Sequence, residues 1–381
     1  KCSTTGGSNT AVGYLALCAN TTGDSNTAVG TCALAINTTG YLNVAVGCRS
    51  LSANTTGFDN TAVGTNSLIA NTEGRQNTAL GKTSLGLNTT GNNNTAVGYQ
   101  ALRNSETAAS NTAVGHNALV CNTTGERQVA IGQGALQSNT TGTRNIAIGS
   151  SALDKNTTAS YNTAIGLESL FNTTTGGSNT AIGSTTMICN TTGVNNVAIG
   201  SSALRYSSTG VSNVAVGVTT LYYSTTADEN TAVGYRSMFY TTTGVGNTAV
   251  GQDSLRYNTT GHTNVAVGRN SLCGNLTGYG NTGIGESSMY SNKIGNANVA
   301  VGRCALYLNI SGSNNVAVGA NALYSNTTGD HNIGIGSDAI FNNTTGTGNT
   351  ALGFCAGRQS ITGDYNVSIG YRAGYGNKVG S

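Results

Sequence analysis

The chain has 381 residues, of which only 8% are charged and 55 are glycine, and it contains neither proline nor tryptophan. The formal net charge is +3 and basic residues are interleaved with acidic ones, so we expect no surface that binds nucleic acid. No apolar run approaches the roughly 20 residues that span a bilayer, so we expect no membrane span.

The dominant feature is a glycine every 17 residues, repeated 22 times from Gly13, Gly30 and Gly47 to Gly370 without insertion or deletion. A disordered chain has no reason to keep such a period, whereas stacked repeats must keep one register. We therefore predict an all-β fold, a parallel β-solenoid or β-roll with 22 rungs of 17 residues. It forms a single domain over residues 1–381, with a partial rung at 1–8, full rungs over 9–381 and two atypical rungs at the end.

We number the positions of a rung as columns, with Asn9 in column 1 and Gly13 in column 5. Column 2 is always Thr, Val or Ile, column 3 is Ala in 19 rungs, and column 4 is always Val, Ile or Leu. This pattern predicts a short strand over columns 2 to 4, the first at residues 10–12. Because strand side chains alternate, columns 2 and 4 share one face and column 3 lies on the other.

The rest of the rung predicts a turn, a second short strand and a second turn. Column 9 is Leu or Met in 19 rungs, and with column 4 it forms the expected aliphatic core. Glycine in columns 5 and 15 suits positive φ or close backbone approach. Column 1 is Asn in 21 rungs and column 12 in 16, which predicts amide ladders between rungs. The last two rungs replace the column 9 aliphatic residue by Gly357 and Gly374, which indicates a cap or a docking end.

Charged residues show which columns face water. Of 31 charged residues, 27 lie in columns 6, 7, 10, 11, 16 and 17, four lie in columns 13 and 14, and none lies elsewhere. Column 3 is therefore expected to be out of water. The preferred interpretation is that another subunit packs on its alanines. The alternative is a thin two-layer core in which alanines face each other within one chain.

The nine cysteines form no C-x-x-C pair and lie near no histidine at ligand spacing, so we expect no metal site and no cofactor. Cys2 and Cys18 occupy adjacent rungs, as do Cys32 and Cys48, and each pair is a candidate disulfide. Such bridges favour an oxidising, extracellular setting.

N-x-S/T sequons are a further candidate site. If the chain is secreted by a eukaryotic host or encoded by its virus, they predict a glycan-coated rod. The alternative is that Asn and Thr each serve the turn independently. The sequon asparagines are Asn20, Asn37, Asn54, Asn88, Asn93, Asn122, Asn139, Asn156, Asn172, Asn190, Asn258, Asn275, Asn309, Asn326, Asn342, Asn343 and Asn366.

Aromatic residues recur at the rung spacing and predict two surface ladders. Exposed rings are a candidate platform for sugar or for a neighbouring fibre, because rings supply apolar area at low entropy cost. The simpler alternative is that ring stacking only stabilises the solenoid. The ladders are Tyr206, Tyr223, Tyr240 and Tyr257 in column 11, and Tyr290, Tyr307, Tyr324 and Phe341 in column 10.

Catalysis and ice binding find little support in the residues. His116, His262 and His331 are isolated, and no nucleophile or phosphate-loop motif is present, so we expect no enzyme. Ice-binding solenoids use T-x-T, with both hydroxyls on one side of a strand, whereas Thr21 and Thr22 are adjacent and point oppositely.

The motifs N-T-A-V-G at 9–13 and N-V-A-I-G at 196–200, followed three residues later by Ala or Ser, resemble the head repeats of trimeric autotransporter adhesins of the YadA type. Similar repeats occur in phage and virus fibres. The resemblance implies a left-handed β-roll that forms a homotrimer with an extracellular binding or spacer role. The added N-T-T-G turn and the cysteines depart from that family.

Together these features predict an extracellular structural fibre or filament protein, located outside the cell or on a cell or virion surface. Its main partner is itself, as a homotrimer or as a lateral or end-to-end filament. The alternative is a trimeric adhesin or a virus or phage fibre shaft that binds glycans or a surface receptor; ice binding is less favoured. At about 4.8 Å per rung, 22 rungs would make a rod of roughly 105 Å.

Overall fold

The computed structural model describes residues 5–376. The chain divides into two compact units, Lys1–Thr192 and Gly193–Ser381. Each unit is a parallel β-solenoid in which every rung contributes one three-residue strand, and the described residues form no helix. The predicted fold class is therefore confirmed.

The strands of the first unit occupy columns 2 to 4 of successive rungs, as predicted. They are β1 (Thr10–Val12), β2 (Thr27–Val29), β3 (Val44–Val46), β4 (Thr61–Val63), β5 (Thr78–Leu80), β6 (Thr95–Val97), β7 (Thr112–Val114), β8 (Val129–Ile131), β9 (Ile146–Ile148), β10 (Thr163–Ile165) and β11 (Thr180–Ile182).

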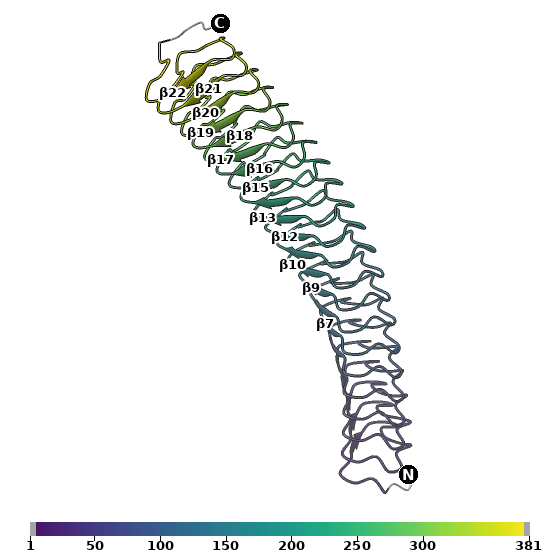
Figure 1. Cartoon of the computed structure of the whole chain (residues 1–381). Coiled ribbons are helices and arrows are strands. Elements are labelled where there is room, and N and C mark those ends of the chain that lie inside the picture. Colours follow the sequence, from purple (N-terminus) through teal and green to yellow (C-terminus); the bar gives the residue numbers. More distant parts are fainter. Residues whose placement is uncertain (1–4, 377–381) are drawn as a thin grey trace. The chain divides into compact units, whose positions relative to one another are not determined.

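The second unit repeats the arrangement. Its strands are β12 (Val197–Ile199), β13 (Val214–Val216), β14 (Thr231–Val233), β15 (Thr248–Val250), β16 (Val265–Val267), β17 (Thr282–Ile284), β18 (Val299–Val301), β19 (Val316–Val318), β20 (Ile333–Ile335), β21 (Thr350–Leu352) and β22 (Val367–Ile369). Within each unit the strands lie on one side of the coil, and turns form the other side (Figure 1).

Pairing between strands follows the repeat without slippage. Within each unit, successive strands pair in parallel, so that Thr10 lies opposite Thr27 in the first unit and Val214 opposite Thr231 in the second. The offset is always one rung, as the constant period predicted. Same-column residues therefore stack above one another throughout each unit.

The orientation of the strands differs from the prediction. Column 3 alanines such as Ala28 and Ala215 are fully buried, and they face column 9 residues such as Leu34 and Leu221, which are also fully buried. Columns 2 and 4 are half-buried or exposed in every strand. Column 3 is out of water, as predicted, but the chain's own interior covers it and not a second subunit. Assigning column 4 to the core was wrong, because the coil has room for alanine opposite leucine and not for two layers of β-branched side chains.

The predicted second strand is also absent from the described rungs. Columns 6 to 11 form a turn in which the residues of columns 7 and 9 have positive φ, for example Arg49 at 57° and Leu51 at 48°. These turns still stack by hydrogen bonds, because the Leu51 N–H donates to the carbonyl of Ser67 at 3.0 Å. The backbone ladder therefore continues through a segment that is not β-strand.

Glycine in column 5 is required by the backbone itself. Gly47 has a φ of +132°, and a Cβ built on it would lie 2.7 Å from the carbonyl oxygen of Gly64 in the next rung. In column 15 the constraint is close approach alone, since a Cβ on Gly40 would clash with the carbonyl of Gly57 and the side chain of Asn37. Both predicted glycine roles are confirmed.

Two buried amide ladders hold consecutive rungs together, as the sequence predicted. In column 1, Asn43 Nδ2 donates to Asn26 Oδ1 at 3.1 Å and to the carbonyl of Gly57 at 2.9 Å. In column 12, Asn37 Nδ2 donates to Asn20 Oδ1 at 2.8 Å and to the carbonyl of Gly40 at 2.9 Å. The interior thus combines an apolar column of Ala and Leu with polar columns whose N–H groups are paired.

Candidate functional site

One regular surface is the outer sheet face, which we define as the side chains of columns 2 and 4. No charged residue occurs in these columns in any of the 22 rungs. The column 4 side chains are substantially exposed, for example 38% at Val250 and 40% at Ile284. A face of β-branched residues without charge along a sheet is the kind of surface that packs against another sheet.

The second surface is an aromatic patch in the second unit, formed by six rings. Tyr206, Tyr223, Tyr240 and Tyr257 stack in column 11 with successive ring-centroid distances of 5.5, 5.4 and 5.3 Å. Beside them, Tyr222 and Phe239 of column 10 stack at 5.0 Å and make edge contacts to the column 11 rings. The predicted ladder is confirmed as a structure, and it is wider than predicted.

Arginines bracket this patch. Arg205 lies over the ring of Tyr206 at 5.8 Å, and Arg256 lies over the ring of Tyr257 at 5.0 Å. Burial raises the pKa of the Tyr222 hydroxyl, and its hydrogen bond with Tyr206 raises it further. Tyr222 therefore stays neutral through the physiological range, while an arginine lies at each end of the patch.

A shallow groove of about 510 Å³ runs beside the tyrosine ladder. Column 11 forms one wall and column 13 forms the other, while the side chains of the intervening column point into the core. The groove is lined by Tyr223, Thr225, Tyr240, Thr242, Tyr257, Thr259 and Leu276.

The second predicted ladder is also formed. Tyr290, Tyr307, Tyr324 and Phe341 stack with centroid distances of 5.2, 5.1 and 5.0 Å, and Arg358 lies over the ring of Phe341 at 5.2 Å. Burial raises the pKa of Tyr307, as do the neighbouring tyrosines. The groove described above is lined by the column 11 ladder and not by this column 10 ladder.

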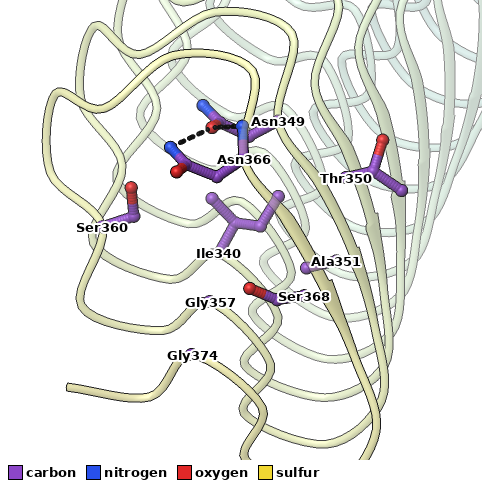
Figure 2. Close-up of a pocket in the computed structure, with 9 residues that line it drawn as sticks. All are labelled: Ile340, Asn349, Thr350, Ala351, Gly357, Ser360, Asn366, Ser368 and Gly374. Carbon is purple, nitrogen blue, oxygen red and sulfur yellow. Dashed lines mark hydrogen bonds between the residues drawn. The ribbon is translucent and has the colours of Figure 1, made fainter. Parts of the chain in front are cut away.

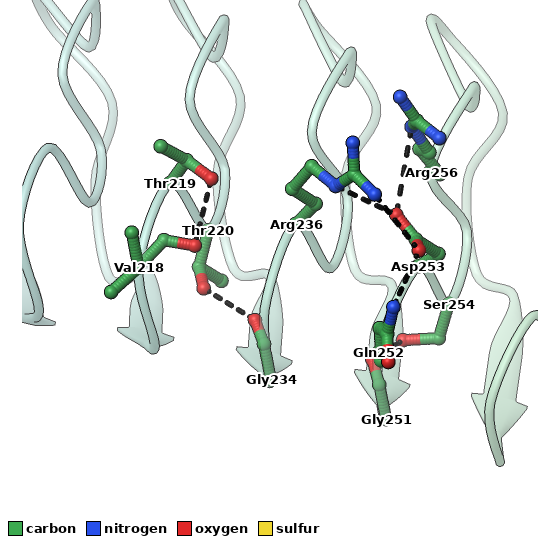
Figure 3. Close-up of polar contacts among 10 residues, drawn as sticks. All are labelled: Val218, Thr219, Thr220, Gly234, Arg236, Gly251, Gln252, Asp253, Ser254 and Arg256. Atoms are coloured by element: carbon green, nitrogen blue, oxygen red, sulfur yellow. Dashed lines mark hydrogen bonds and ion pairs between the residues drawn. The ribbon is translucent and has the colours of Figure 1, made fainter.

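Figure 3 shows a half-buried ionic cluster around Asp253, whose member Arg256 also contacts the ring of Tyr257. Asp253 Oδ1 lies 3.1 Å from Arg236 Nε and 3.6 Å from Arg256 Nε, and Gln252 donates to Asp253 Oδ2 at 3.2 Å. Cys273 is buried nearby, and burial, followed by the charge of Asp253, raises the pKa of its thiol to about 11. The ion pair with Asp253 holds Arg256 over the ring of Tyr257 at the end of the ladder, and the raised pKa of Cys273 disfavours its reactive thiolate form.

The last rungs of the second unit enclose a cavity of about 20 Å³, where Gly357 and Gly374 replace the column 9 leucine (Figure 2). The side chain of Ile340 ends the aliphatic column at its inner side, and Ser360 and Ser368 lie along its wall. Asn366 still continues the column 1 ladder by donating to Asn349 Oδ1 at 2.9 Å. The amide ladder therefore extends further toward the C-terminal end than the leucine column does.

Most predicted sequon asparagines are structural. Those in column 12 are buried, and where the ladder is continuous both N–H groups of the amide are already donated, as at Asn37 and Asn326. A glycan must replace one of these hydrogens, so an asparagine that donates both of them leaves no site for a glycan in the folded chain. Outside column 12, Asn93 is exposed, and Asn172, Asn342 and Asn366 are half-buried.

Of the two predicted disulfides, only Cys32–Cys48 has both cysteines among the described residues. Cys2 lies outside the described residues, so its pairing with Cys18 is not seen. Cys32 and Cys48 are both free in the structure, and the predicted bridge between them is not formed. Cys32 lies in column 7 and Cys48 in column 6 of the next rung, so the rung stacking does not place one directly above the other. Cys18, Cys121, Cys189, Cys273, Cys304 and Cys355 are free as well.

No known protein-family model and no curated protein matches this chain. Within residues 5–376, no three His, Cys, Asp or Glu side chains lie close enough to hold a metal ion. In the same range, no helix is long and apolar enough to cross a membrane. Function is therefore inferred from the surfaces described above.

Proposed function

We propose that this protein is a structural fibre protein that associates with copies of itself through the outer sheet face. The observation that carries the proposal is the exposure of columns 2 and 4, which are apolar or Thr and uncharged in all 22 rungs. A solvated sheet face normally includes charged residues, and here the charges lie in the turn columns. A second copy offers the same regular, uncharged surface, so two faces can pack without burying a charge.

The area of the outer sheet face can be estimated for each unit by itself. Columns 2 to 4 span about 7 Å along a strand and eleven rungs rise about 53 Å, which gives each unit a strip of about 350–400 Å². Stable complexes bury roughly 800 Å² per partner, so the outer sheet face of one unit supplies about half of such an interface. An extracellular location remains part of the proposal.

The oligomeric state tests the proposal through two matched pairs of substitutions on the same two rungs. Val216→Lys with Val250→Lys places charge on the outer sheet face, whereas Val218→Lys with Gln252→Lys places it in column 6, which naturally contains Lys82. Sedimentation velocity should show an assembled wild type, a shift to monomer in the first pair and no shift in the second. A wild type that stays monomeric at all concentrations would falsify the proposal.

Ice binding is a second candidate, because the structure gives it a different face from the one considered in the sequence. Column 2 is Thr in 12 rungs and projects outward beside column 4 Val, Ile or Leu, in a regular array. The array is T-x-V or T-x-I and not T-x-T, so fibre assembly is the preferred proposal. Thermal hysteresis from a monomeric wild type would favour ice binding over assembly. The adhesin or fibre-shaft alternative shares the assembled rod and adds a receptor.

A further inference from the structure

The groove beside the tyrosine ladder is apolar although three of its residues are threonines. Thr225 Oγ1 donates to the carbonyl of Thr242 at 3.2 Å, and Thr242 Oγ1 donates to the carbonyl of Thr259 at 3.1 Å. Thr259 Oγ1 continues the row by donating to the carbonyl of Leu276 at 3.0 Å. Because every hydroxyl is turned toward the backbone of the next rung, the methyl groups are left to line the groove.

The opposite wall is a row of parallel rings. Interplanar angles between successive column 11 tyrosines are 2°, 6° and 10°, so each inner ring has a neighbour on both faces. The short centroid separations leave no gap between successive rings, and the four rings form one unbroken row. The exposed part of the wall is therefore a long strip of ring edges that is parallel to the stacking direction.

These features select among ligand classes. A sugar bound by an aromatic platform needs open ring faces and polar partners for its hydroxyls, and this groove offers neither. A flat apolar molecule that lies along the stack contacts ring edges on one side and methyl groups on the other. The lining contains no charged residue, and Arg205 and Arg256 beside the ladder disfavour a cationic ligand.

We propose that this groove binds an elongated, flat, uncharged aromatic molecule of the stilbene class along the stacking direction. It spans Tyr223, Tyr240 and Tyr257 and ends against Leu276. The site lies in columns 11 and 13, away from the outer sheet face, so self-association through columns 2 and 4 leaves it open. Binding in the groove therefore does not depend on the proposed function.

The probe is trans-resveratrol, a neutral hydroxystilbene, titrated into the whole protein and followed by its fluorescence and by calorimetry. We expect one saturable site per chain. Tyr240→Ser should weaken binding at least about tenfold, since stacked or edge contacts to one ring are removed from the centre of the groove. Thr242→Glu should do the same by adding a charge to the other wall.

The sequence supplies controls for folding and for the site. Serine occurs in column 11 at Ser138 and Ser291, and glutamate occurs in column 13 at Glu106, so both substitutions are compatible with a rung. Tyr307→Ser, in the ladder that lacks this groove, should leave resveratrol binding within about twofold of wild type.

Three outcomes would overturn the proposal. The first is the absence of saturable resveratrol binding to a wild type with normal circular dichroism. The second is an equal loss of binding in Tyr240→Ser and Tyr307→Ser, which would make stacking in general and not the groove responsible. The third is competition by cellohexaose, or tighter binding of the cationic dye thioflavin T than of resveratrol, since either would assign the groove to another ligand class.

Discussion

Each full rung from the first to the twentieth places a large aliphatic residue in column 9 in a left-handed backbone conformation. Leu34, Leu221 and Leu323 have φ of 49°, 51° and 53°, and the β-branched Ile340 has 48°. This conformation costs a residue with a Cβ about 1–2 kcal/mol, which is comparable to what burying a leucine contributes. The side chain therefore stabilises the rung only because it is completely enclosed.

Substitution at Leu221 tests this balance. Leu221→Ala should lower the free energy of unfolding by about 2–5 kcal/mol, because it leaves a cavity opposite Ala215. Glycine usually costs more than alanine, yet Leu221→Gly should be as stable as Leu221→Ala or more so, because glycine relieves the positive φ. Urea denaturation followed by circular dichroism gives the comparison. A glycine variant less stable than the alanine variant by about 1 kcal/mol or more would contradict the strain argument.

The buried thiol of Cys273 should make the folded protein less stable at alkaline pH. Its pKa is about 11 in the folded chain and near 9.0 when exposed, chiefly because burial disfavours the thiolate. The folded state holds this proton more tightly, so the stabilisation is complete below pH 9 and is lost as pH rises toward 11. Between pH 8.5 and 10.5, wild type should lose about 1–2 kcal/mol more than Cys273→Ala, measured by urea denaturation.

The control for the comparison of wild type with Cys273→Ala is chemical labelling of the Cys273 thiol. Alanine is native to column 10 at Ala35, so the variant should fold normally. Iodoacetamide at pH 8 should label the exposed Cys18 and Cys48 well before Cys273, as mass spectrometry of peptides can show. Equal labelling rates, or parallel pH profiles for the two proteins, would mean that Cys273 is not shielded.

At the scale of the structural element, the column 12 ladder is interrupted where serine replaces asparagine, whereas Thr173 Oγ1 still accepts from Asn190 Nδ2 at 3.2 Å. Ser105 interrupts column 12 between Asn88 and Asn122, and both Asn88 Oδ1 and Ser105 Oγ are buried without a hydrogen-bond partner. Buried polar atoms without partners destabilise the fold. The breaks in the ladder are therefore local weak points within the described rungs.

Ser105→Asn should repair one of these weak points. The new amide can donate to Asn88 Oδ1 and accept from Asn122 Nδ2, as asparagines in neighbouring rungs already do. We expect unfolding free energy to rise by about 1–2 kcal/mol and the amides of the adjacent rungs to exchange hydrogen more slowly. Ser105→Ala serves as the control, because it removes the orphaned hydroxyl without completing the ladder. A melting temperature for Ser105→Asn no higher than that of Ser105→Ala would argue against the repair.

At the scale of the whole molecule, the period predicts most of the fold. The constant spacing from Gly13 to Gly370 fixes the rung, the position of its strand and the stacking of like residues. The columns without charged residues identify the side chains that avoid water. Asn37 and Asn43 are polar but buried, and their burial follows from the amide ladders that they form. Two aromatic ladders follow from residue spacing alone, because stacking makes same-column neighbours touch.

Other features depend on geometry that the sequence does not express. Because side chains alternate along a strand, Val216 and Ala215 must point in opposite directions. Alternation does not show which of them points inward, and here alanine does, because the coil is narrow. Leucine gives no signal for positive φ, so Leu51 suggested a strand where a turn forms. The apolar groove requires the hydroxyl of Thr242 to turn toward the backbone, which no residue count indicates.

The restriction of strand contacts to adjacent rungs has one more consequence, which concerns how such a chain changes during evolution. Since each described rung pairs only with the rungs before and after it, duplication or deletion of one whole repeat inserts or removes one complete layer and leaves the others unaltered. Length would then change in increments of about 4.8 Å. The length of the stack is therefore set by the number of repeats that the gene encodes.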